Sequence, residues 1–129
     1  CIAIKTIYSQ NDLRLSAYFL PKNVRMPIHD HPKMFVLGYV LLGEMQAEMY
    51  TKLAKETYRK ETKILKKDDF MLIEGEKDNL HQFTGLSNTV FLDILFPDYD
   101  HTNRVCTHYR EVSVDATKMT AKLEIDEDP

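Results

Sequence analysis

Three of the five histidines in this 129-residue chain are spaced so that they could bind one metal ion. His29 and His31 form an HxH pair in a segment expected to be a strand, where side chains two residues apart point to the same face. His81 begins a later strand-like segment after a turn-rich stretch, which could return it to the same end of a barrel. The sequence therefore predicts a metal site formed by three neutral imidazoles.

No carboxylate completes this set of ligands. The positions four and five residues after His31 are Phe35 and Val36, which excludes a site of two histidines and one carboxylate. Three neutral ligands leave a divalent ion with its full charge, and such an ion favours an anionic ligand such as a thiolate. An amine of the same molecule could bind beside the sulfur and leave one position for dioxygen. One hypothesis is therefore an iron site that oxidises a thiol or aminothiol.

Ligand identity leaves other interpretations open. A three-histidine zinc site would activate water for hydrolysis or hydration. Iron chemistry needs access for dioxygen and an apolar pocket, whereas zinc chemistry needs a water-lined cavity and a base. A third interpretation is a binding module without catalysis, in which the histidines are half-buried side chains that hydrogen-bond to their neighbours.

Asp93 is a further candidate, because it is the only charged residue in the apolar segment 90–96. Burying an unpaired carboxylate costs on the order of several kcal/mol, so the group needs a hydrogen-bond donor. The free N–H of a ligand histidine or the amine of a substrate would serve. The alternative is that this face of the strand is partly exposed at the end of the barrel.

The elements that must position these residues are short strands separated by turns. About ten strands in one small domain are typical of a sandwich or barrel, and their rhythm is best matched by a cupin-like double-stranded β-helix, the jelly-roll barrel. We expect residues 1–129 to form one such all-β domain. The predicted strands are residues 3–8, 14–20, 24–31, 35–42, 44–51, 62–65, 69–73, 81–84, 89–96, 106–114 and 122–125.

Two of these segments carry more specific predictions. Residues 35–42 are almost continuously apolar, which predicts a strand buried on both faces. Residues 52–60 are charged, which predicts a hairpin loop at the rim of the barrel. Apolar residues within positions 53–66 do not repeat every 3.6 residues, so no helix is expected there.

Composition excludes several classes of partner. A formal net charge of −3 without a basic face argues against binding to nucleic acid or anionic membranes. No apolar run approaches the roughly 18 to 20 residues of a membrane-spanning helix. Two cysteines, one of them at position 1, predict no disulfide framework and therefore a reducing, cytoplasmic setting, extending to the nucleus. We expect a monomer.

Several blocks in order across residues 24–112 resemble one family of thiol dioxygenases, which contains cysteamine (2-aminoethanethiol) dioxygenase and the plant cysteine oxidases. The first block resembles the family's MPLHDHPxM stretch, and later blocks resemble its IHxFT, xLDVLxPPY and RDCTYY motifs. The blocks are residues 26–34 (MPIHDHPKM), 41–45 (LLGEM), 80–84 (LHQFT), 91–99 (FLDILFPDY) and 104–109 (RVCTHY).

The resemblance implies an iron(II) enzyme that converts a thiol to a sulfinic acid with both atoms of dioxygen. Its substrates would be an aminothiol such as cysteamine or the N-terminal cysteine of a peptide or protein, and the second activity would allow oxygen sensing. Carried over by position, His29, His31 and His81 would bind the iron. Asp93 would be an active-site carboxylate or would support a ligand, and Tyr99 would lie in the pocket near the substrate.

The sequence departs from this family in two places. Some animal members join a cysteine covalently to a tyrosine two residues later, but here His108 stands at that distance from Cys106. A role for His108 as an acid or base in the pocket is an alternative to ordinary packing in a strand. Members also carry a partly helical segment ahead of the first strand, which we expect to be missing from residues 1–129.

Overall fold

A computed structural model describes residues 2–129, and every regular element in that range is a β-strand. The predicted all-β class is therefore confirmed, and residues 53–66 contain no helix. The strands are β1 (Ala3–Gln10), β2 (Leu13–Leu20), β3 (Arg25–His29), β4 (Phe35–Leu42), β5 (Glu44–Ala54), β6 (Thr57–Lys66), β7 (Phe70–Glu74), β8 (Leu80–Gly85), β9 (Thr89–Phe96), β10 (His108–Asp115) and β11 (Thr120–Ile125).

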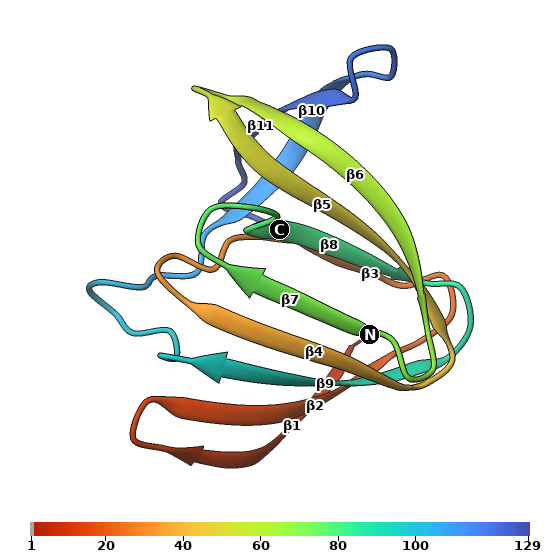
Figure 1. Ribbon diagram of the computed structural model, residues 1–129, viewed down its shortest axis with the longest axis vertical. Coiled ribbons are helices and arrows are strands. Elements are labelled where there is room, and N and C mark those ends of the chain that lie inside the picture. The colour runs from red at the N-terminus through yellow and green to blue at the C-terminus, as the bar shows by residue number, and fades with distance from the viewer. Residues whose placement is uncertain (1) are drawn as a thin grey trace.

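The strands form two sheets that pack face to face (Figure 1). One sheet has five strands in the order β1-β2-β9-β4-β7, and the other closes into a barrel in the order β10-β11-β6-β5-β8-β3. Neighbouring strands run antiparallel, and successive strands often lie in different sheets. This arrangement is the predicted jelly-roll barrel of the cupins.

Alternation along each strand separates the core from the surface. On β5, Met45, Ala47 and Met49 are buried between the two sheets, whereas the side chains between them are less buried. A second, smaller core fills the closed barrel around Ile28 and Tyr50. The candidate site lies in the first core, where the inner faces of the two sheets meet.

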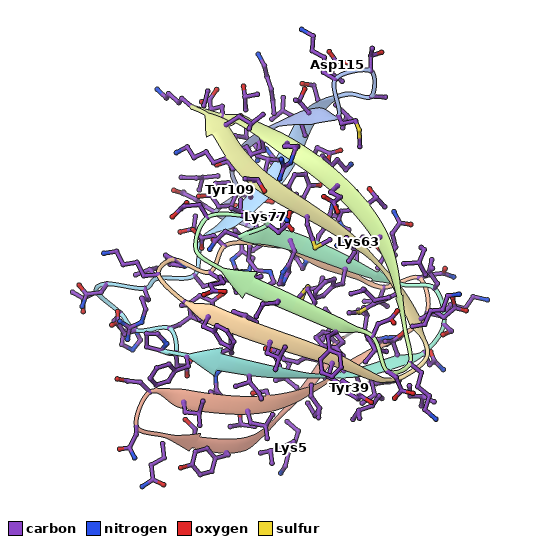
Figure 2. All side chains as sticks on the ribbon, in the orientation of Figure 1. Lys5, Tyr39, Lys63, Lys77, Tyr109 and Asp115 are labelled. Atoms are coloured by element: carbon purple, nitrogen blue, oxygen red, sulfur yellow. The ribbon has the colours of Figure 1, made fainter. Side chains whose placement is uncertain are left out.

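Two sequence predictions about individual strands are wrong. Strand β4 is not buried on both faces, because Val36 and Val40 point into the core while Phe35 and Leu41 are each 40% exposed. The neighbouring Tyr39 also lies on the outer face of the sheet, as Figure 2 shows. Residues 52–60 are not a loop, because β5 and β6 extend through them and only Lys55 and Glu56 turn. Paired backbones, rather than burial, hold this charged end of the hairpin.

Among residues 2–129, no helix has the length and apolar character needed to cross a membrane. The structure describes one of the two cysteines, Cys106, as a free thiol. Cys1, the other residue in the prediction of no disulfide framework, lies outside the described residues.

Candidate metal centre

A β-bulge in β3 aims His29 into the core. On the paired strand β8, Phe83 lies opposite Met26 and His81 lies opposite His29, so β3 uses one residue more than β8 over this stretch. Residues three apart on a regular strand point to opposite faces, but the extra residue brings Met26 and His29 to the same face. Pro27 lies within the bulge, where its lack of an N–H is tolerated.

His31 does not lie on the strand that the sequence predicted. Strand β3 ends at His29, and His31 belongs to the turn that follows it. The side chain of Asn79 fixes this turn, since its Oδ1 accepts the His31 N–H at 2.9 Å and its Nδ2 donates to the His31 carbonyl at 2.8 Å. His29 and His31 therefore converge through a turn held by a distant residue, and not through strand periodicity.

The structure brings His29, His31 and His81 together. One ring nitrogen from each lies within 4.8 Å of the others, and the ring centroids are 4.4 to 4.8 Å apart. His31 and His81 are buried, while His29 keeps partial exposure. No other group of three or more histidine, cysteine or acidic residues in the described range has such an arrangement.

Hydrogen bonds at the histidines leave ring nitrogens free for a ligand. His29 Nδ1 is 2.9 Å from the Pro27 carbonyl and His31 Nδ1 is 2.7 Å from the Asn79 carbonyl. A carbonyl only accepts, so both Nδ1 atoms carry the proton and each Nε2 has an available lone pair. Both ring nitrogens of His81 are buried without a partner in residues 2–129. An unpaired buried nitrogen is unfavourable, and a metal ion held by the three histidines would satisfy one of the two.

Burial also keeps these imidazoles uncharged. Loss of hydration lowers the pKa of His29 to about 4 and that of His31 to about 3. The pKa of His81 also lies well below its ordinary value, first through burial and then through repulsion from the other two rings. The histidines are therefore neutral near pH 7, which is the form that binds metal.

Asp93 lies on the inner face of β9 and is only 6% exposed, so the alternative of a partly exposed face is excluded. Its cross-strand neighbour is Gly38, where an added Cβ would lie 3.1 Å from Asp93 Oδ1, so the glycine leaves room for the carboxylate. Burial raises the Asp93 pKa to about 7, although the charge of Arg14 lowers it. Asp93 Oδ1 has no hydrogen-bond partner among residues 2–129, and none of the three histidines donates to it.

Tyr99 lies beside the histidines in the segment that follows β9. Its ring centroid is 6.1 Å from that of His31, and its hydroxyl donates to the Asp30 carbonyl at 2.6 Å. The side chain of Asp30 makes a second contact, since its Oδ1 accepts the Thr107 N–H at 2.8 Å. Burial raises the Tyr99 pKa, so the phenol stays protonated and remains a donor.

Sequence reasoning missed the role of Asn79. Its position in a turn-rich segment two residues before His81 was the only signal, and nothing local indicates that it meets residues 48 positions away. His108, a residue with two open interpretations, pairs with His29 between β10 and β3, and their ring centroids are 5.9 Å apart. The structure thus places a fourth imidazole beside the three-histidine cluster.

Comparison with known proteins finds one matching family and several similar chains. The family described as PCO_ADO matches residues 1–128. The chain is 33% identical over 116 residues to a probable 2-aminoethanethiol dioxygenase of Dictyostelium discoideum, which covers 80% of this chain and 53% of that protein. It is 28% identical over 116 residues to plant cysteine oxidase 2 of Arabidopsis thaliana, covering 80% of this chain and 42% of that protein. The chain thus spans about half, or less, of the length of these curated relatives.

Solved structures share the fold at low sequence identity. KdgF from Halomonas sp. aligns with a TM-score of 0.62 at 19% identity, covering 77% of this chain and 81% of that protein. A cupin superfamily protein from Desulfitobacterium hafniense aligns with a TM-score of 0.58 at 13% identity, covering 73% and 75% of the two chains. These likenesses concern the fold alone.

Replacing Asn79 with alanine tests how much this residue orders the site. Asn79→Ala removes both side-chain hydrogen bonds to the backbone of His31, so we expect the dissociation constant for Co²⁺, measured by absorption, to rise roughly 10- to 100-fold. Asn103→Ala, at an exposed position, is the matched control and should bind Co²⁺ as the unchanged chain does. An unchanged affinity in folded Asn79→Ala would contradict this role.

The buried histidines predict acid sensitivity of the metal-free protein. Between their folded pKa values (about 4 and 3 for His29 and His31) and the ordinary value of 6.5, the unfolded chain binds protons that the folded chain does not. Stability therefore rises with pH in this window. Asp93 and Asp30, with raised pKa values, act in the opposite sense, but three histidines outnumber them.

We therefore expect the free energy of unfolding of chelator-treated protein, measured with urea, to fall as the pH is lowered from 7 to 5. His81→Gln removes one of the buried imidazoles and should make this decrease shallower. Equal stability at the two pH values, or greater stability at pH 5, would show that the imidazoles are not held neutral by the fold.

Proposed function

The chain belongs to the PCO_ADO family, and from this we propose that it is an iron(II)-dependent thiol dioxygenase. The reaction joins both atoms of dioxygen to the sulfur of a thiol and yields the sulfinic acid, so that R–SH and O₂ give R–SO₂H. The substrate is the N-terminal cysteine of a peptide or protein, or a small aminothiol such as cysteamine. The observation that carries the proposal is the set of three inward-facing neutral imidazoles, one of them without any hydrogen-bond partner in the described residues.

In this proposal His29, His31 and His81 hold the iron. When bound, iron(II) supplies the redox chemistry through which dioxygen reacts with a thiolate. The chain's own contribution is a set of neutral ligands, which leaves the positive charge of the ion uncompensated and so favours an anionic sulfur ligand. The carbonyls of Pro27 and Asn79 keep two of the rings in the orientation that presents Nε2.

Asp93 binds the substrate amine in this proposal. Its Oδ1 is buried without a partner, and an ammonium group would satisfy it with a charge-assisted hydrogen bond. Such a pair would favour the ionised carboxylate over the protonated form that burial alone favours. An amine held beside the thiol selects aminothiols over simple thiols.

Tyr99 orders the wall of the pocket. Its hydroxyl is committed to the Asp30 carbonyl, between the two histidines of the HxH pair, so its ring lies beside His31. In this position the ring restricts the access of water to the site and presents an apolar surface to the substrate. Because dioxygen is a substrate, turnover limited by its concentration would also let the enzyme act as an oxygen sensor.

The experiment that tests the function supplies the purified protein, loaded with iron(II), with a cysteine-initiated peptide and with cysteamine in air. We expect a mass increase of two oxygen atoms on at least one thiol, and a KM for dioxygen measured in the same assay decides whether sensing is feasible. Metal analysis after expression in iron-replete medium accompanies the assay. Stoichiometric zinc without iron would favour a zinc enzyme, and bound iron without oxidation would favour a binding module.

The role of Asp93 predicts a substrate-dependent defect. Asp93→Asn keeps the shape of the side chain but removes the charge, so kcat/KM for cysteamine should fall roughly 10- to 100-fold through loss of a charged hydrogen bond. Oxidation of 2-mercaptoethanol, which has a thiol but no amine, is the control reaction and should change little. An equal loss for both thiols would argue that Asp93 does not recognise the amine.

A further inference from the structure

Polar side chains line the inner face of β2, beside Asp93. Arg14, Ser16 and Tyr18 alternate with outward-facing residues, and Ser16 is fully buried. Tyr18 stacks on Phe91 of the neighbouring strand with centroids 4.9 Å apart, which places this face of β2 inside the sandwich. The side chain of Arg14 is 21% exposed, so most of it is buried.

Arg14 has donors left over. Its Nε donates to Asp98 Oδ2 at 2.9 Å and its Nη1 donates to Ser16 Oγ at 3.4 Å. A guanidinium carries five N–H donors in a rigid fork. The Tyr18 hydroxyl is a further hydrogen-bond partner of Arg14, and the N–H groups beyond these three contacts are available to another acceptor. The pair with Asp98 also fixes the direction in which the fork points.

Strand register places Arg14 next to Asp93. Ser16 lies directly opposite Asp93 between β2 and β9, and Arg14 is two residues from Ser16 on the same face. Such diagonal neighbours are roughly 7 to 8 Å apart at the backbone, within reach of a long side chain. The influence of the Arg14 charge on the Asp93 carboxyl agrees with this proximity.

The same wall faces the histidines. Phe83 of β8 contacts Phe91 of β9 with centroids 5.3 Å apart, which joins the two sheets at this level. His81 precedes Phe83 by two residues on β8, and Asp93 follows Phe91 by two residues on β9. His81 and Asp93 therefore lie toward the same end of the sandwich, the end where β4 begins. A guanidinium and a carboxyl group therefore lie side by side on the wall opposite the three imidazoles.

A cysteine at the start of a peptide carries an amine and a carbonyl on the same carbon. Adjacent negative and positive groups suit this pattern, because the carboxylate binds the amine and the guanidinium binds the carbonyl oxygen. Free cysteine offers a carboxylate oxygen at the same place. Cysteamine has the amine and the thiol but no oxygen for Arg14 to bind.

We infer that Arg14 is a specificity-determining residue whose guanidinium binds the oxygen next to the amine held by Asp93, so that this site prefers cysteinyl compounds over cysteamine. The inference rests on the proposed function, because it takes the amine to be at Asp93. It adds a second contact that selects the substrate class. Cysteine-initiated peptides and free cysteine share the recognised oxygen, and the experiment separates them.

Arg14 could instead act only as an anchor for the segment that carries Tyr99. Asp98 joins that segment to β2 through Arg14, and its backbone also donates to the Asp12 carbonyl at 2.8 Å. Loss of an anchor would disturb Tyr99 and so affect all thiols alike. Asp98→Asn removes the charge of the anchor but keeps an oxygen that can accept the Arg14 Nε–H, so the guanidinium keeps its direction, and this variant is therefore the matched control.

The test compares Arg14→Gln and Asp98→Asn with the unchanged chain on a cysteine-initiated pentapeptide, free cysteine and cysteamine. We expect Arg14→Gln to raise KM for the cysteinyl compounds roughly 10- to 100-fold, as loss of a charged hydrogen bond would. KM for cysteamine should rise by a much smaller factor, because the variant also loses the charge that favours ionised Asp93. The larger increase identifies the peptide or the free amino acid as the better ligand. Asp98→Asn should change KM for all three thiols alike, and the same pattern in Arg14→Gln would overturn the inference.

Anaerobic calorimetry separates this inference from the proposed function. The dissociation constants of the pentapeptide and of cysteamine for the iron-loaded protein require no oxidation, and thermal unfolding checks that Arg14→Gln is folded. A selective loss of peptide binding in Arg14→Gln supports the role of Arg14 even when the unchanged chain oxidises no thiol. Normal oxidation by the unchanged chain, with unselective binding changes in the variant, overturns the role of Arg14 alone.

Discussion

The reciprocal hydrogen bonds between Asn79 and the backbone of His31 join two turns that are distant in sequence, and the geometry of the candidate site depends on them. The turn after β3 contains His31, and the segment before β8 leads directly into His81. The Asn79 side chain also donates to the Gly75 carbonyl, and this bond restricts the conformation of the segment before β8. With the bulge of β3 aiming His29, three rings from a strand end, a turn and a second strand converge on one point.

Burial determines the pKa shifts of the ionisable groups on both walls of the site. It favours the uncharged form of every ionisable group, so it lowers the pKa of the histidines and raises that of Asp93. Neutral imidazoles suit a metal ion, whereas a carboxyl without a partner suits an incoming ammonium group. In the proposed function, an ion held by the histidines on one wall and a carboxyl that binds an amine on the other would match a molecule that carries both a thiolate and an amine.

An aromatic column underlies this arrangement. His81 stacks on Phe83, Phe83 and Phe91 form a T-shaped pair, and Phe91 stacks on Tyr18, with successive centroids 4.3, 5.3 and 4.9 Å apart. The column crosses from β8 to β9 and then to β2, so it ties both sheets together directly beneath the site. Packed aromatic rings of this kind have little freedom to move, and they restrict the position of His81.

The fold class and the family could be predicted from the sequence alone, because local patterns of apolar and polar residues indicate which side chains are buried. The alternation of apolar and polar residues predicted the strand series and the jelly-roll class, and the five motif blocks predicted the family that the comparisons then confirmed. The three histidines were identified from their types and spacing. The hairpin predicted at residues 52–60 is present, but its loop is shorter than predicted, because backbone pairing extends both strands through charged residues that their composition alone does not mark as strand.

Only the tertiary structure decided how these side chains meet. The apolar segment of β4 has one exposed face, since the outer side of its sheet is open in residues 2–129, and no local pattern records which layers pack on a strand. The bulge of β3, the contact from Asn79 to His31 and the diagonal placement of Arg14 beside Asp93 all depend on register between strands far apart in the chain. The local sequence indicates which side chains are buried, whereas the register between distant strands determines which of them meet at the candidate site.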